Sequence, residues 1–140
     1  MSVDAVDVMV VADLAMPEAY AVPDENAGRL KNVLAMFRGP SLPSHCLAYA
    51  VRHPEAGTIL IDTGLHPDAS TNLRKDFGPA MALFFRGIKP PARPYLDQLR
   101  DLGIEPDAVE RVIMTHLHVD HTGAMRLLPN ARFTCAREEW

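Results

Sequence analysis

The sequence has few of the features that mark nucleic-acid-binding or membrane-spanning proteins. Its 18 Asp and Glu residues outnumber its 14 Lys and Arg residues, which gives a net charge of −4. Because phosphate binding needs a basic surface, this balance argues against a nucleic-acid partner. No apolar run approaches the roughly 20 residues that a bilayer-spanning helix needs, so we expect no membrane partner.

Cysteine is also scarce, since only Cys46 and Cys135 are present. Two isolated cysteines do not make a disulfide framework, and they predict reduced thiols. Residues 1–16, MSVDAVDVMVVADLAM, contain aspartates and no Lys or Arg before the apolar residues. They lack the positively charged start of a secretory signal. Together these absences predict a cytoplasmic protein.

The chain has 140 residues, enough for one modest domain, and 48% of them are hydrophobic, as in an ordinary globular protein. Its last residues, CAREEW (135–140), look like a strand end and the first turn of a helix that continues. We therefore expect residues 1–140 to be part of a domain that is truncated at its C-terminal side.

The first half of the chain contains two kinds of periodic segment. Alternating valines at 6–10 have the period of a strand. The apolar runs at 45–53 and 58–62, joined by a turn with Pro and Gly, predict a hairpin. Apolar residues at helical spacing in 28–39 predict a short helix, although a loop wrapped on the core would give a similar pattern.

The second half alternates between helices and strands. Residues 93–103 have leucines on one face between a proline and a glycine, which is typical of a helix. A buried strand is expected at 111–115, a short helix at 122–129 and a further strand at 131–136. This order of elements predicts an α/β layer protein with a mixed sheet and flanking helices.

Residues 64–94 are rich in Pro and Gly and have no steady period, so they predict a long, partly helical loop. Loops of this length inside compact domains are uncommon and often functional, which makes a substrate-facing insertion one interpretation. The loop contains the apolar side chains Met81, Leu83, Phe84 and Phe85. They can line a channel for an acyl chain, or they can pack onto the helix at 93–103.

The segment VIMTHLHVDHTG (112–123) contains three of the six histidines. In an extended chain, His116 and His118 point the same way, so both imidazoles can bind one cation. Asp120 and His121 can reach a second cation nearby. These donors suit zinc, and also iron, manganese or cobalt. One histidine alone would indicate an ordinary polar residue, but four such donors after a buried strand favour a metal site.

The segment THLHVDHTG (115–123) resembles the H-x-H-x-D-H signature of the metallo-β-lactamase superfamily. ILIDTG (59–64) resembles the strand and turn that accompany that signature, and GIEPDAVERVIMT (103–115) is similar to the branch of quorum-quenching N-acyl homoserine lactonases. One departure is HTGAM (121–125), where that branch often has a second glycine. The resemblance implies an αββα sandwich, of which this chain supplies the N-terminal half and one exposed apolar inner face.

The resemblance also implies a site for two divalent metal ions, with zinc as the first expectation. His116 and His118 would bind the first ion, and Asp120 and His121 the second. Asp62 would orient a ligand by hydrogen bonding. Its alternative interpretation, a turn residue before a glycine, stays equally open.

The activity implied by the resemblance is hydrolysis of a small-molecule lactone or related ester. A metal-activated water attacks the carbonyl carbon, and Asp120 passes a proton to the leaving alkoxide. The same signature fits a β-lactamase or a thioester hydrolase of the glyoxalase II kind. An iron-dependent oxidoreductase on the same fold and an inactive fragment are alternatives from other classes.

Three further ligands are expected later in the chain of such proteins, namely two histidines and a metal-bridging aspartate. Residues 122–140 contain neither histidine nor aspartate. His45, His53 and His66 lie outside the pattern and are expected to be surface or loop residues, although His66 follows DTG closely and can face the site. We therefore expect residues 1–140 alone to bind metal weakly and not to catalyse.

Overall fold

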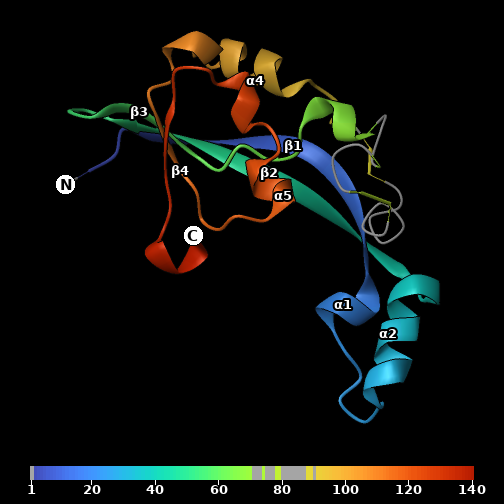
Figure 1. Ribbon diagram of the computed structural model, residues 1–140. Helices are drawn as coiled ribbons and strands as arrows, with labels where there is room; N and C mark the ends of the chain where they lie inside the picture. Colours follow the sequence, from blue (N-terminus) through green and yellow to red (C-terminus); the bar gives the residue numbers. More distant parts are fainter. Residues whose placement is uncertain (1, 71–73, 75–77, 80–87, 90) are drawn as a thin grey trace.

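The computed structural model of the protein is a twisted five-stranded sheet with helices around it (Figure 1). It describes residues 2–70, 74, 78–79, 88–89 and 91–140. The strands follow one another in the order β1-β2-β3-β4-β5. They are β1 (Ala5–Pro17), β2 (Ser41–His53), β3 (Gly57–Ile61), β4 (Arg111–Ile113) and β5 (Arg132–Thr134).

The sheet is mixed, which confirms the predicted α/β class. β1, β2 and β3 pair in an antiparallel way, whereas β3 pairs with β4 and β4 with β5 in parallel. The hairpin predicted between 45–53 and 58–62 is confirmed as β2 and β3, whose ends meet at His53 and Gly57. Parallel strands need a crossover connection, and the segment between β3 and β4 contains α4 (Tyr95–Asp101).

The helices α1 (Glu18–Ala21), α2 (Arg29–Arg38) and α4 lie in two places. α1 and α2 sit at the far end of the β1–β2 ribbon, and α4 covers one face of the sheet (Figure 1). α2 and α4 confirm the helices predicted at 28–39 and 93–103. Pro94 directly precedes α4, and its ψ of 145° is extended. None of the helices among the described residues combines the length and apolar character needed to span a bilayer.

The helix predicted at 122–129 is wrong in position. The structure has a one-turn helix, α5 (Val119–Thr122), followed by a 3-10 turn at Met125–Leu127. The chain turns as soon as it passes His118, whose carbonyl accepts the amides of His121 and Thr122 at 3.0 Å each. Asp120 and His121 therefore lie in a helical turn. The C-terminal helix start is likewise a 3-10 turn, Arg137–Glu139.

The core lies between the sheet and α4. Its strand residues alternate along β1, β2, β3 and β4, so that they share one face of the sheet. They are Met9, Ala48, Ala50, Leu60 and Val112, each at most 1% exposed. Tyr95 and Leu99 of α4 are equally buried. The Gln98 side chain donates from Nε2 to the Val10 carbonyl at 2.8 Å, which ties α4 to β1.

The opposite face of the sheet carries exposed apolar side chains. Val6 and Val8 are 53% and 59% exposed, and Ile113 is 45% exposed. Val6 and Val8 thus lie on the face away from α4, and Met9 on the covered face. An exposed apolar face is the feature expected of one sheet in a two-sheet sandwich. That residues 1–140 are part of a larger domain stays a prediction.

The long loop predicted at 64–94 is described in part. It begins with a 3-10 turn at Pro67–Ser70, and Lys89 pairs with Asp13 of β1 through two backbone hydrogen bonds of 2.9 and 3.1 Å. The apolar cluster at 81–85 lies outside the described residues, so its two interpretations stay predictions.

Candidate metal centre

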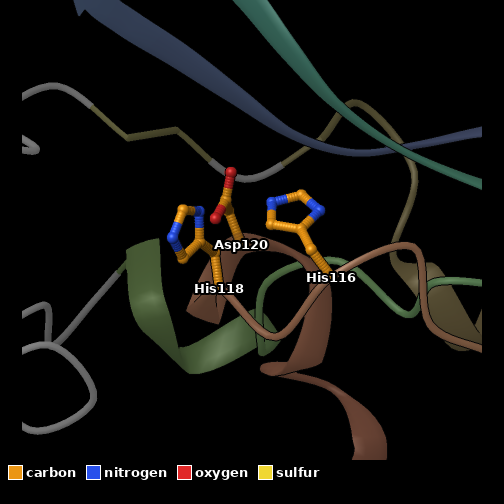
Figure 2. Close-up of side chains that lie close together, drawn as sticks. All are labelled: His116, His118 and Asp120. Carbon is orange, nitrogen blue, oxygen red and sulfur yellow. The ribbon is translucent and has the colours of Figure 1, made fainter. Parts of the chain in front are cut away.

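Three candidate ligands gather where β4 ends and α5 begins. One donor atom each of His116, His118 and Asp120 lies within 4.8 Å of the others. Figure 2 shows the two imidazole rings and the carboxylate on one side of the chain. The rings of His116 and His118 have centroids 4.7 Å apart. Two imidazoles and a carboxylate at this separation suit a transition metal or zinc.

His121 lies beside the same group. Its ring centroid is 4.0 Å from that of His116, and its Nε2 is 3.5 Å from Asp120 Oδ2. The four residues expected from the sequence are thus brought together, with Asp120 in contact with His121. Which of them bind a first or a second ion stays a prediction.

Asp62 is buried directly behind these residues. It is 2% exposed, and its Oδ2 lies 2.8 Å from His121 Nδ1. Thr115 also donates to it, from its amide to Oδ1 at 2.8 Å and from its hydroxyl to Oδ2 at 2.6 Å. The backbone φ of Asp62 is +57°, a conformation that costs roughly 1–3 kcal/mol in a residue with a side chain. These contacts support an orienting role, in a residue that also forms the turn after β3.

The turn after β3 also holds α5 in place. The carbonyl of His121 accepts hydrogen bonds from the Thr63 amide and hydroxyl, at 2.9 and 2.8 Å, and from the Gly64 amide at 3.1 Å. The Ala124 amide in turn donates to the Gly64 carbonyl at 3.1 Å. Thr63 and Thr115 were not predicted as site residues, although Thr63 directly follows Asp62 and Thr115 directly precedes His116.

A pocket of about 690 Å³ opens beside the cluster. It is lined by His118, Asp120 and His121 together with apolar side chains from β1, β2 and the segment before α4. The apolar part includes Leu14, Met16, Leu47, Tyr49 and Ile88. The pocket thus joins an apolar wall to a polar side that also includes Ser44, His45, Asp62 and Thr115. Such an arrangement suits a small ligand with one apolar and one polar part.

Comparison with known proteins identifies the family. A model of the Metallo-beta-lactamase superfamily matches residues 42–140. The chain belongs to this superfamily. Superfamily relatives include an N-acyl homoserine lactonase AttM from Rhizobium johnstonii, 34% identical over 92 residues. An N-acyl homoserine lactonase AiiB from Agrobacterium fabrum is 32% identical over 94 residues.

The chain matches only a part of these proteins. Each match covers 66% of this chain, and it covers 34% of AttM and 33% of AiiB. Two solved structures extend the likeness of fold to 99% of the chain. One is a quorum-quenching N-acyl homoserine lactone lactonase, with a TM-score of 0.70 and 21% identity, of which 48% is covered. The other is an N-acyl homoserine lactone hydrolase, with a TM-score of 0.68 and 22% identity, of which 51% is covered. At these identities the structures support the superfamily fold alone.

The remaining histidines have other contacts. His45 lies on β2 with Nδ1 2.7 Å from Asp13 Oδ1, and its side chain is 61% exposed. His53 Nδ1 accepts two backbone amides of the hairpin turn. His66 accepts the amide of Asp68 at Nδ1, at 3.1 Å. His45 and His53 thus lie on the hairpin strands, with His45 exposed beside the pocket, whereas His66 is a loop residue whose side chain is only 10% exposed.

Cys46 connects β2 to α5, and its thiol is expected to react slowly. Its Sγ donates to the Asp120 carbonyl at 2.6 Å, and burial raises the pKa of the thiol to about 12. Because the thiolate is the reactive form, iodoacetamide should modify the half-buried Cys135 well before Cys46 in the folded protein. Peptide mass spectrometry measures both rates, and denatured protein is the control. Equal rates in the folded protein would contradict the buried position of Cys46.

Proposed function

We propose that the protein is a metal-dependent hydrolase that opens lactones or related esters, in the manner of the N-acyl homoserine lactonases. The observation that carries this proposal is the cluster of His116, His118 and Asp120, with donor atoms within 4.8 Å, beside a largely apolar pocket. The relatives named as lactonases support the substrate class. Because the matches cover about a third of those relatives, the activity is proposed for the whole protein.

In this proposal His116 and His118 hold a first divalent ion, and Asp120 and His121 a second. Zinc fits the imidazole and carboxylate donors best, and iron, manganese or cobalt are alternatives. When bound, such an ion supplies Lewis acidity and lowers the pKa of a water molecule to about 7. The resemblance implies three further ligands, which residues 122–140 do not supply.

The surrounding residues orient the donors and move the proton. Asp62 Oδ2 accepts the Nδ1 proton of His121, so that Nε2 of this ring keeps its lone pair on the side of Asp120. The Asp120 carboxylate takes up the proton that the nucleophilic water loses and returns it to the leaving alkoxide. The Cys46 thiol and the Thr63 backbone hold α5, which carries Asp120 and His121.

The apolar wall of the pocket determines the substrate class. Leu14, Met16 and Leu47 offer no charge and lie on the same pocket as Asp120. They favour a substrate with an alkyl or acyl chain attached to the ester ring, because apolar surface is buried on binding.

A substrate panel tests this proposal. The protein is expressed from its complete reading frame, loaded with zinc, and offered N-acyl homoserine lactones, a β-lactam and a glutathione thioester. We expect acid release from the lactones, loss of this activity after chelation and its return with zinc. Residues 1–140 alone serve as a comparison and are expected to be inert. Turnover by these residues would contradict the need for further ligands.

The other outcomes point to the alternatives. Hydrolysis of the thioester without the lactone would favour a glyoxalase II-like enzyme. Bound iron with oxygen consumption would favour an oxidoreductase. A metal-loaded protein that hydrolyses no member of the panel would overturn the proposal.

A further inference from the structure

We infer that Thr115 is a positioning residue, whose hydroxyl links Asp62 to His116 and sets the tautomer of that imidazole. Asp62 sets the tautomer of the His121 imidazole through a direct hydrogen bond. One buried carboxylate thereby prepares two rings to present Nε2 to a metal ion. This inference rests on the proposed metal-binding role of His116 and His121.

The first step is the direction of the hydrogen bonds at Thr115. Its Oγ1 lies 2.6 Å from Asp62 Oδ2 and 3.1 Å from His116 Nδ1. A hydroxyl has one proton, and an ionised carboxylate can only accept. The hydroxyl proton therefore goes to Asp62, and Thr115 Oγ1 can only accept from His116. His116 must carry its proton on Nδ1, which leaves the lone pair on Nε2.

The second step concerns the other ring. His121 Nδ1 lies 2.8 Å from the same oxygen, Asp62 Oδ2. Because the carboxylate accepts, this ring too carries its proton on Nδ1, and its Nε2 lies 3.5 Å from Asp120 Oδ2. The amide of Thr115 donates to Asp62 Oδ1 at 2.8 Å and holds the carboxylate in this orientation.

The third step is the consequence for metal binding. An imidazole binds a metal ion through its unprotonated nitrogen. The hydrogen bond that the other ring nitrogen makes decides which nitrogen is unprotonated. Partners of this kind typically change metal affinity 10- to 100-fold when they are removed. Thr115 is exposed, but its hydroxyl donates to the buried Asp62. Removing the hydroxyl is therefore expected to affect ligand orientation and also to lower the free energy of unfolding.

The test compares Thr115→Val, which removes the hydroxyl, with Thr115→Ser, which keeps it. Thr58→Val is the matched control, because Thr58 lies at the start of β3, the end opposite to Asp62. Nitrogen-15 NMR of the metal-free protein at alkaline pH reports the tautomer of each histidine. Competition with a chromogenic chelator reports zinc affinity.

We expect wild type, Thr115→Ser and Thr58→Val to keep the His116 proton on Nδ1. Thr115→Val should shift His116 toward the other tautomer and weaken zinc binding about tenfold. An unchanged tautomer and affinity in Thr115→Val would overturn the inference, as would a Thr115→Ser variant that behaves like Thr115→Val.

The readouts separate this inference from the proposed function. A wild-type protein that binds no zinc contradicts the proposed function, while the tautomer of His116 in wild type and Thr115→Ser still decides the inference. If Thr115→Val does not fold, the tautomer of His116 in the wild type and in Thr115→Ser decides the inference. A His116 proton on Nε2 in the wild type would overturn it in every case.

Discussion

Replacing Asp120 with asparagine is expected to lower the kcat for lactone opening by about 100- to 10,000-fold, the range for loss of a general acid–base group. Asp120 lies in the donor cluster and 3.5 Å from His121 Nε2. Asparagine has nearly the same shape but cannot take up a proton or offer a negative charge. Initial rates over a range of substrate concentrations, at saturating zinc, give kcat and KM separately.

The matched control for this variant is Asp107→Asn, which changes the same atoms at an exposed residue of the 3-10 turn Pro106–Ala108. It should leave kcat unchanged. Zinc content, measured for each protein, separates a lost ligand from a lost proton carrier. An Asp120→Asn enzyme that keeps its zinc and its kcat would exclude Asp120 as the proton carrier.

Replacing Gly64 with alanine is expected to lower the free energy of unfolding by about 3 kcal/mol, from backbone strain and overpacking together. The φ of Gly64 is +75°, which favours glycine. A Cβ at this position would lie 2.0 Å from Val11 Cγ2, inside the core of the sheet. Urea unfolding of the metal-free protein, followed by circular dichroism, measures the change.

Gly57→Ala separates the two causes. Gly57 has nearly the same φ, +74°, but a Cβ there would meet nothing within 4 Å. Gly57→Ala should therefore lower the free energy of unfolding by about 1 kcal/mol, from the backbone strain alone. Adding Val11→Ala to Gly64→Ala should recover part of the free energy of unfolding that Gly64→Ala loses. Equal losses in the two glycine variants would show that the contact with Val11 is unimportant.

Local patterns predicted most of the secondary structure. The β2–β3 hairpin was predictable because two apolar runs flank a short turn, and α4 because its leucines recur at helical spacing. Both signals lie within about a dozen residues, so no distant contact was needed. The face taken by the valines at 6–10 was not predictable, because it depends on where α4 packs.

The site shows the limit of local patterns. The sequence predicted a helix only from residue 122, but Val119–Thr122 already forms a helical turn. Bonds from Thr63 and Gly64 to the His121 carbonyl hold this turn in place. A four-residue helix is too short to be stable by itself, so its position follows from tertiary contacts that no local period reports.

The sequence by itself determined the donors: three histidines and an aspartate within six positions, whose chemistry is that of a metal site. Only the tertiary structure decided what lies behind them. Asp62 and Thr115 meet across 53 residues of chain, and Cys46 reaches Asp120 across 74. Parallel pairing of β3 with β4 brings Asp62 and Thr115 together. Such pairing buries apolar strands over long sequence separations, and a pattern of neighbouring residues does not record it.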